Sequence, residues 1–288
     1  MNQRLEIIVS PYTGYCFGVK RAMRLIEEGL ERDGAAIRSI GHVIHNPQAV
    51  ECLRARGVIP VSSMDEIAEG ETLIIRAHGV DPDIISEAKR RRIRLIDTTC
   101  PFVRRSQNYV RRIAAEGRRI IIIGDRNHPE VRGILGQAGE DSLILATPAE
   151  VRTMPRIESA GVVVQTTFSR EKAMEIIFNL KERIPDLRVH DTICQATMLR
   201  SEATLKLARS VDMVLVVGGR ESANTMRLFQ MCVDLGVRTR FIETADEIDP
   251  SWFEGCRRVG LTTGTSTPDW IIDEVLERLD RISCGGSR

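Results

Sequence analysis

The sequence predicts an α/β protein in which helices cover parallel sheets. Short runs of β-branched and aliphatic residues recur along the whole chain, segments with helical spacing lie between them, and no linker rich in Pro, Ser or Gly interrupts the alternation. Regular alternation is typical of parallel sheets, because neighbouring parallel strands need a crossover that is usually a helix. The length of 288 residues favours two or three small domains over a single one.

The elements follow from the hydrophobic pattern. Uninterrupted apolar runs predict buried strands, and apolar residues spaced three and four positions apart predict helices. The expected strands are residues 5–9, 72–76, 93–96, 119–123, 142–145, 161–164, 212–217 and 259–262. The clearest helical segments are residues 19–30, 105–115, 172–183 and 201–208. Residues 283–288 (SCGGSR) have the composition of a frayed end.

An internal repeat divides the chain into similar parts. The tetrads DTTC and DTIC end at Cys100 and Cys194, which lie 94 residues apart. From three cysteines, a helix and a strand lead to a glycine and then to a polar side chain four residues later: Cys16 to Gly41 and His45, Cys100 to Gly124 and His128, and Cys194 to Gly218 and Ser222. A further helix and strand lead to another polar residue in each part: His78, Thr166 and Ser266. We therefore expect three α/β units, at residues 1–97, 98–191 and 192–288.

The repeat also predicts where a ligand binds. In open α/β sheets, ligands lie beyond the carboxyl ends of the strands, where helix N-termini point. Three such edges around a pseudo-threefold axis would enclose one central site, so we expect a trefoil of small parallel-sheet domains. The alternative is a run of similar α/β units whose strand-end residues are unrelated.

Composition excludes several classes of protein. No stretch approaches the roughly 20 apolar residues that a membrane span needs. The 41 Lys and Arg residues against 40 Asp and Glu residues give a net charge of +1, which argues against a general attraction to nucleic acid or anionic lipid. The first residues lack the pattern of a secretory signal, so we expect a cytoplasmic protein without a disulfide framework.

The cysteines suggest a metal centre. None of the seven forms a C-x-x-C pair, so a metal site must gather them from distant parts of the chain. Cys16, Cys100 and Cys194, one per repeat, form a set of soft ligands suited to zinc or to an iron-sulfur cluster. A cubane cluster with three protein ligands would keep one iron open for a substrate oxygen, which favours reductive chemistry. Cys52 and Cys232 are expected to be buried hydrophobic residues.

Polar residues at the expected strand ends suggest an anion site. The set comprises His45, His78, His128, Thr166, Ser222, Asn224 and Ser266. Helix starts are indicated by Asn46-Pro47, His128-Pro129 and Thr267-Pro268, each an N-cap followed by proline. Free helix N–H groups beside histidines and hydroxyls predict a phosphate or diphosphate ligand. The alternatives are that these side chains only cap helices, or that the histidines bind zinc.

Glu130, two residues after His128, has two interpretations. An acidic residue at a helix start commonly only interacts favourably with the helix dipole. Beside an open iron, however, it would be the natural proton donor to a departing hydroxyl, with Thr166 relaying or orienting the proton.

Residues 89–119 form a basic run. They contain eleven Lys and Arg residues against Asp97 and Glu116, a local balance of 11 − 2 = +9. The run is either a solvated face or a docking surface for an acidic electron carrier. Nucleic acid is not expected there, because only Phe102 and Tyr109 are available for stacking on bases.

Seven strings of the sequence together closely resemble the 4-hydroxy-3-methylbut-2-enyl diphosphate reductase family of the non-mevalonate isoprenoid pathway. They are GYCFGV at 14–19, IHN at 44–46, AHGV at 77–80, DTTCP at 97–101, HPEV at 128–131, QTT at 165–167 and ICQAT at 193–197. The strings occur in order from Cys16 to about Asp269.

The resemblance implies a trefoil of three α/β domains around one 4Fe-4S cluster held by Cys16, Cys100 and Cys194. It implies a two-electron reductive dehydroxylation that yields isopentenyl and dimethylallyl diphosphate, with the substrate hydroxyl on the unique iron. Glu130 would be the proton donor, with Thr166 beside it. The diphosphate would be held by His45, His78, His128, Ser222, Asn224 and Ser266. The expected electron donor is an acidic carrier of the ferredoxin or flavodoxin type.

One departure from the family pattern concerns the diphosphate. The family usually has two serines before the asparagine, whereas this chain has Ser222-Ala223-Asn224. One diphosphate contact is then missing or is replaced, for example by Thr225. Two other classes remain open: a Cys/His zinc hydrolase, and a non-catalytic iron-sulfur redox sensor, which the departure at Ala223 favours.

Overall fold

The structure is a computed structural model that describes residues 4–33, 37–139 and 141–284, so residues 285–288 of the expected frayed end lie outside it. The described residues form two compact units. Unit 1 contains residues 4–17, 44–51 and 195–284, and unit 2 contains residues 18–33, 37–43, 52–139 and 141–194. None of the helices in the described part of the chain is both long enough and apolar enough to cross a bilayer.

Unit 2 contains two four-stranded parallel sheets. The first sheet has the strand order β3-β2-β4-β5. Its strands are β2 (Ile37–Ile40), β3 (Val58–Val61), β4 (Thr72–Ile75) and β5 (Arg94–Asp97). The helices that precede or connect these strands in the chain are α1 (Phe17–Asp33), α2 (Pro47–Ala55) and α3 (Pro82–Arg90), with a 3-10 turn at Met64–Glu66.

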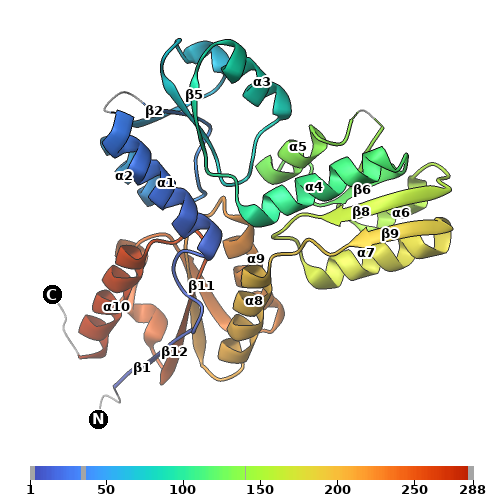
Figure 1. Cartoon of the computed structure of the whole chain (residues 1–288). Coiled ribbons are helices and arrows are strands. Elements are labelled where there is room, and N and C mark those ends of the chain that lie inside the picture. Colours follow the sequence, from blue (N-terminus) through green and yellow to red (C-terminus); the bar gives the residue numbers. More distant parts are fainter. Residues whose placement is uncertain (1–3, 34–36, 140, 285–288) are drawn as a thin grey trace. The chain divides into compact units, whose positions relative to one another are not determined.

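The second sheet of unit 2 has the order β7-β6-β8-β9. Its strands are β6 (Arg119–Ile123), β7 (Leu143–Leu145), β8 (Ser159–Val164) and β9 (Asp186–His190). The accompanying helices are α4 (Pro101–Ala115), α5 (Pro129–Leu135), α6 (Pro148–Thr153) and α7 (Arg170–Arg183). Helices α4 and α7 run along opposite faces of this sheet, as expected when βαβ crossovers cover a parallel sheet (Figure 1).

Unit 1 contains the third sheet, with the order β1-β12-β10-β11. Its strands are β1 (Glu6–Val9), β10 (Met213–Val217), β11 (Arg238–Ile242) and β12 (Arg258–Thr263). Its helices are α8 (Gln195–Ala208), α9 (Ala223–Asp234) and α10 (Asp269–Ser283), with 3-10 turns at Ala245–Glu247 and Pro250–Phe253.

The three sheets share one topology, which confirms the predicted α/β class with parallel sheets. In each, the first strand in the chain lies second in the sheet, its successor lies at the edge, and the remaining two follow on the other side. The third sheet fits this description when β1, from the start of the chain, takes the place of the fourth strand. The division into units at residues 1–97, 98–191 and 192–288 stays a prediction. Strand β1, which it assigns to the first unit, pairs with β12 in the third sheet.

A second signature of the repeat lies after β3, β7 and β11. Each strand is followed by a capping box, in which a Ser or Thr and a Glu three residues later satisfy each other's backbone N–H groups. The pairs are Ser63 with Glu66, Thr147 with Glu150, and Thr244 with Glu247. The sequence carries the pattern [ST]-x-x-E at all three places.

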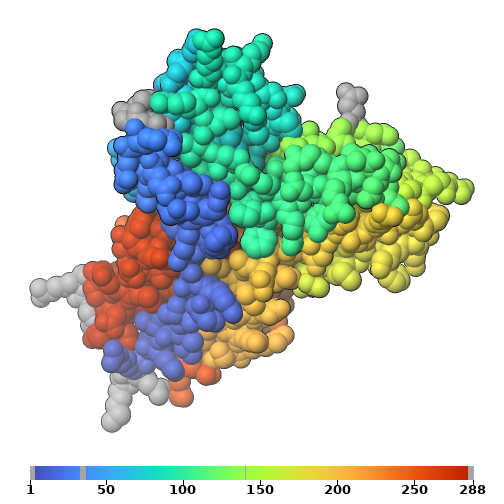
Figure 2. Space-filling view, in the orientation of Figure 1, coloured from blue at the N-terminus to red at the C-terminus, as the bar shows by residue number. Residues whose placement is uncertain are grey.

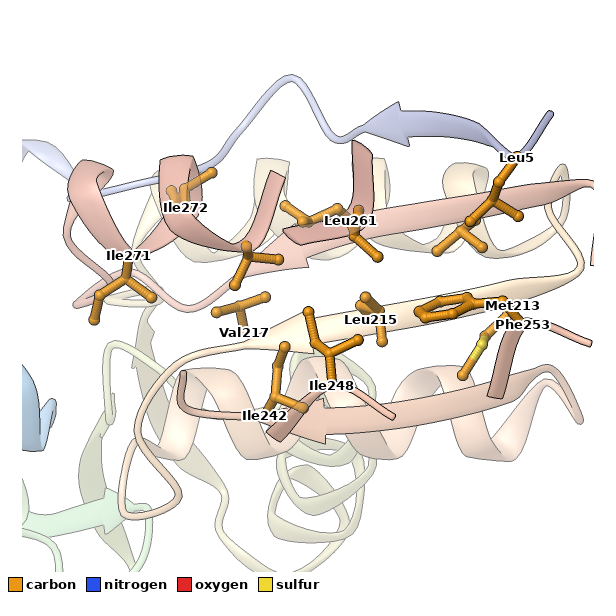
Figure 3. Packing of buried hydrophobic residues seen from close by; sticks show 13 residues of the cluster. Leu5, Met213, Leu215, Val217, Ile242, Ile248, Phe253, Leu261, Ile271 and Ile272 are labelled. Carbon is orange, nitrogen blue, oxygen red and sulfur yellow. The ribbon is translucent and has the colours of Figure 1, made fainter. Parts of the chain in front are cut away.

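The core of unit 1 shows why the strands read as continuous apolar runs. Alternate residues of β10, Met213, Leu215 and Val217, join a cluster with side chains of β12 and α10 (Figure 3). Val214 and Val216 face the other way and pack with residues of α8 and α9. Because both faces of the strand are covered, no polar residue interrupts it.

Four strands have no counterpart among the apolar runs predicted as strands: β2, β3, β9 and β11. Three of them lie at sheet edges, where one side needs no partner strand and polar residues or proline are tolerated. β3 contains Pro60, and β9 and β11 carry exposed charged residues. β2 lies inside its sheet, but Arg38 and Ser39 interrupt its apolar pattern.

Helix α4 packs very closely against β8 at Gly161. A Cβ atom at this glycine would lie 2.5 Å from Cγ1 of Ile113, which is fully buried on α4. The equivalent position in unit 1 is Gly260 on β12, where a Cβ would lie 2.8 Å from Cγ of Leu207 on α8. Two of the three sheets therefore share this close approach, whereas the first sheet has Leu73 at the equivalent position.

Replacing Gly161 by Val is expected to lower the free energy of unfolding by about 1–3 kcal/mol, because Ile113 must move to make room. Urea unfolding of the Gly161→Ala and Gly161→Val variants measures this, and the loss should grow with the size of the side chain. Equal unfolding midpoints for the two variants and the unchanged protein would contradict the packing argument.

Candidate active site

Glu130 and Thr166 form a buried pair in unit 2. Glu130 lies in the first turn of α5 and is 1% exposed, and Thr166 lies two residues beyond the end of β8. The Thr166 N–H donates to Oε1 of Glu130 at 2.6 Å, and the Thr166 hydroxyl donates to Oε2 at 2.7 Å. Burial raises the pKa of Glu130 to about 7, although the hydrogen bonds from Thr166 oppose this effect. A carboxyl group with this pKa can hold and release a proton at neutral pH.

Two histidines of unit 2 lie next to this pair. His128 caps α5, as predicted, and its Nδ1 accepts the Glu130 N–H at 3.2 Å. A neutral His128 that accepts through Nδ1 carries its hydrogen on Nε2, where it can donate to an anion. The His78 ring contacts the His128 ring edge-on, with the centroids 5.6 Å apart. The structure thus brings together four of the predicted residues: His78, His128, Glu130 and Thr166.

Cys100 and Cys194 follow the edge strands β5 and β9, and the DT-x-C tetrads explain how they are positioned. The Thr98 hydroxyl donates to the carbonyl of Ile75, and the Thr192 hydroxyl donates to the carbonyl of Val164, so each tetrad is anchored to the end of the neighbouring strand. The aspartates of the tetrads accept backbone N–H groups two residues on. The polar residues of the tetrads therefore fix the backbone just before each cysteine.

One backbone hydrogen bond is common to all three cysteines. The Cys100 N–H donates to Ala77, the Cys194 N–H to Thr166 and the Cys16 N–H to Thr265, at 2.9, 2.9 and 3.0 Å. Each acceptor lies two residues beyond the end of β4, β8 or β12. The structural equivalent of Thr166 is therefore Thr265. The sequence repeat had aligned Thr166 with Ser266, so that alignment was wrong by one residue. Each cysteine is tied to the loop that carries a predicted polar residue.

Unit 1 holds the remaining predicted residues. The Ser266 hydroxyl donates to the carbonyl of His45 at 3.0 Å, and Ser222 caps α9 by accepting the Thr225 N–H at 3.3 Å. A Cβ atom on Gly219 would collide with the carbonyl oxygen of His45, so only glycine allows this approach. His45, Ser222 and Ser266 are therefore held on closely packed loops of the same unit.

Asn224 in α9 offers buried polar atoms that could bind a ligand in unit 1. It is 2% exposed, and neither its Oδ1 nor its Nδ2 has a hydrogen-bond partner among the described residues. A buried amide without partners costs roughly 1–3 kcal/mol, so its polar atoms call for a ligand. Nδ2 is a suitable donor to a phosphate oxygen.

The helix-start predictions have mixed outcomes. Asn46 does cap α2, where Oδ1 accepts the Ala49 N–H at 2.9 Å. The prediction for Thr267 was wrong, because α10 begins one residue later and Thr267 instead donates its hydroxyl to the carbonyl of Val217. Thr225 is fully buried, and its Oγ1 would collide with a Cβ on Gly264. Its suggested role in place of the second serine stays a prediction.

The two cysteines that were expected to be buried hydrophobic residues have different outcomes. Cys232 is buried, as predicted, and burial raises the pKa of its thiol to about 11, so it is a poor metal ligand. Cys52 is exposed, so its assignment to a buried face was wrong. The buried position on this part of α2 belongs to the next residue, Leu53, and Cys52 therefore faces outward.

The basic run is partly neutralised by neighbouring carboxylates. Ion pairs join six of its arginines to acidic residues: Arg90 and Arg91 to Glu87, Arg92 to Glu69, Arg104 to Asp97, Arg118 to Glu116 and Asp186, and Arg119 to Asp141. On α4, in contrast, Arg105, Arg111 and Arg112 are exposed and have no carboxylate within ion-pair distance in the described part of the chain. Four carboxylates outside the run, Glu69, Glu87, Asp141 and Asp186, reduce the excess from +9 to +5, and the three arginines of α4 form a small basic face.

Comparison with known proteins gives a consistent result. The sequence profile of the LytB protein family matches residues 7–280. A 4-hydroxy-3-methylbut-2-enyl diphosphate reductase of Citrifermentans bemidjiense is 43% identical over 278 residues, covering 96% of this chain and 98% of that protein. The reductase of the same name from Aquifex aeolicus is 39% identical over 285 residues, covering 98% of both chains.

Two solved structures also match the fold. A structure of (E)-4-hydroxy-3-methyl-but-2-enyl diphosphate reductase, described as the terminal enzyme of the non-mevalonate pathway, gives a TM-score of 0.74 at 38% identity, covering 96% of this chain and 99% of that one. The E-1-hydroxy-2-methyl-but-2-enyl-4-diphosphate reductase from Plasmodium falciparum gives a TM-score of 0.90 at 29% identity, covering 96% and 88%.

Proposed function

Because the chain belongs to the LytB protein family, we propose that it is a 4-hydroxy-3-methylbut-2-enyl diphosphate reductase. The reaction breaks the allylic C–O bond, consumes two electrons and two protons, and releases the oxygen as water. The products are isopentenyl and dimethylallyl diphosphate. The observation that carries the proposal is the buried Glu130–Thr166 pair, because a departing hydroxyl needs a proton donor that is protonated near neutral pH.

We infer that Cys16, Cys100 and Cys194 hold one 4Fe-4S cluster. Each is the cysteine that follows the fourth strand position of a sheet, and each is fixed by the same backbone hydrogen bond. None is in a disulfide, so all three thiols can serve as ligands. Bound there, the cluster supplies electrons and an open iron for the substrate oxygen. The residue types and their equivalent positions fit this group.

The chain's own residues then bind the substrate and move the proton. Oε2 of Glu130 holds the proton when the carboxyl group is neutral, and the hydroxyl of Thr166 can pass it on or orient the substrate oxygen. Nε2 of His128 and Nδ2 of Asn224 are donors for the diphosphate, with His45, His78, Ser222 and Ser266 completing the set. The burial of Glu130 and Thr166 limits the access of water to the proton path.

The test is anaerobic purification followed by iron and sulfide analysis and a visible spectrum. We expect a brown protein with about four irons per chain. Its spectrum should change when the hydroxylated allylic diphosphate is added, and a strong reductant should then give the two isomeric products. A colourless protein with stoichiometric zinc would instead support the hydrolase alternative. A stable cluster without turnover would support the redox sensor, and neither alternative is favoured by the comparisons.

The electron donor is proposed to be an acidic carrier of the ferredoxin or flavodoxin type that docks on α4. The basic face of Arg105, Arg111 and Arg112 carries the positive charge that complements such a carrier, and α4 lies on the green surface that faces the viewer in Figure 2. The cytoplasmic location and the absence of a nucleic-acid partner stay predictions.

The Arg111→Glu/Arg112→Glu variant is expected to slow electron delivery from an acidic carrier about tenfold or more, because the charge change converts attraction into repulsion. Turnover with a small chemical reductant should be unchanged. The matched control is Lys206→Glu/Arg209→Glu, which makes the same charge change at exposed positions at the end of α8. Equal losses with both reductants, or in both variants, would contradict docking on α4.

A further inference from the structure

Arg200 is a buried arginine on α8 that the proposed mechanism does not use. It lies six residues after Cys194 and is 3% exposed. One terminal nitrogen, Nη1, donates to the carbonyls of Thr263 and Gly264 at 2.7 and 2.8 Å and to Oγ1 of Thr263 at 3.0 Å. The other, Nη2, donates to the carbonyl of Gly14 at 2.9 Å. A single guanidinium therefore joins two separate loops of unit 1.

These two loops carry predicted site residues. Gly14 lies two residues before Cys16, and Gly264 lies two residues before Ser266. Further hydrogen bonds join the same loops directly: the Gly14 N–H donates to Oγ1 of Thr263, and the Cys16 N–H donates to the carbonyl of Thr265, both at 3.0 Å. Moving Arg200 would therefore disturb the spacing between the Cys16 loop and the Ser266 loop.

The charge of Arg200 is the unusual feature. Its hydrogen-bond acceptors within the described residues are carbonyl and hydroxyl oxygens, and none is a carboxylate. Burial lowers its pKa to about 10, and only the nearby Cys16 opposes that shift. Its Nε is also buried without a partner in the described part of the chain. A buried cation is costly unless an anion lies near it, and a cluster bound at the Cys16 loop would be such an anion.

We propose that Arg200 is a positioning residue for the iron-sulfur cluster: it fixes the Cys16 loop against the Ser266 loop and supplies a buried positive charge that stabilises the reduced cluster. This inference rests on the proposed function, because it assumes a cluster bound at Cys16. Reduction adds one negative charge to the cluster and its thiolates. A fixed cation in a medium of low dielectric constant favours the reduced form and so raises the reduction potential.

The experiment compares the unchanged protein with the variants Arg200→Gln, Arg200→Lys and Arg209→Gln, all purified anaerobically. Arg209 is an exposed arginine just beyond the same helix, so its variant loses the same charge away from Cys16. The readouts are iron per chain and the midpoint potential of the cluster from an equilibrium redox titration. We expect a lower midpoint in Arg200→Gln, a midpoint nearer to the unchanged value in Arg200→Lys, and no shift in Arg209→Gln.

Each outcome decides the proposal. A midpoint in Arg200→Gln equal to that of Arg209→Gln would overturn it. If Arg200→Gln binds no cluster, the Arg200→Lys variant decides. Retention of iron in Arg200→Lys supports a role for the positive charge. Loss of iron from a folded Arg200→Lys protein contradicts a role for the charge. Circular dichroism establishes folding. Absence of a cluster from the unchanged protein would instead overturn the proposed function, which separates the two failures.

Discussion

Replacing Glu130 by Gln is expected to lower kcat by about 100-fold to 10,000-fold while leaving the cluster in place. Glutamine has nearly the same shape: its oxygen can still accept the Thr166 N–H, and its NH2 group can donate to the Thr166 hydroxyl oxygen. It has, however, no acidic proton to give at neutral pH. Iron per chain and the visible spectrum should match those of the unchanged protein. An unchanged kcat would remove Glu130 from the mechanism.

The pH dependence of kcat gives an independent check on Glu130. With a pKa of about 7, the carboxyl group is protonated below that pH and ionised above it. The contribution of this group to kcat should therefore be largest below pH 7 and fall as the pH rises through 7. In Glu130→Gln, the residual rate should lack this limb. A profile that keeps the same limb in the variant would assign it to another group.

The same pKa predicts an effect on stability. An unfolded glutamate has its ordinary pKa of 4.5, so between about pH 4.5 and 7 the unfolded chain loses a proton that the folded chain keeps. The stabilisation from this group is present below pH 4.5 and is lost as the pH rises through 7, by up to about 3 kcal/mol. Urea unfolding of the apo-protein should show this loss relative to Glu130→Gln. The exposed Glu158→Gln variant is the control.

The sequence was sufficient to predict the fold class because the interior strands are covered on both faces. β6, β8 and β10 are mostly apolar, and each was recognised as a run. The edge strands were harder, because an edge strand can carry charge, as β9 and β11 do. Nor could local pattern show that β1 joins a sheet whose other strands begin more than 200 residues later.

The candidate site was predictable where it depends on strand ends and not where it depends on packing. Glu130 and Thr166 were proposed as site residues because the sequence itself shows the repeated spacing and the acidic residue after a helix cap. In the structure, two hydrogen bonds join them. Arg200 was missed because a single arginine within a helix looks like any solvated one. Only its burial and its carbonyl acceptors distinguish it.

Replacing Cys194 by Ser is expected to remove most of the cluster iron and to abolish turnover, because a serine oxygen is a hard ligand that replaces a soft thiolate. The backbone should be little changed. The Cys194 N–H still bonds to the carbonyl of Thr166, and the Thr192 hydroxyl still anchors the tetrad. The loss would therefore report ligation and not misfolding.

Two controls sharpen the Cys194 experiment. Cys52→Ser alters an exposed thiol outside the repeat, and it should keep full iron content and kcat. Cys100→Ser alters the equivalent position after β5, where the Cys100 N–H bonds to Ala77, and it should behave like Cys194→Ser. The two variants should lose similar amounts of iron, because Cys100 and Cys194 occupy equivalent positions in sheets of the same topology. If Cys194→Ser kept its iron while Cys52→Ser lost it, the ligand assignment drawn from the repeat would be wrong.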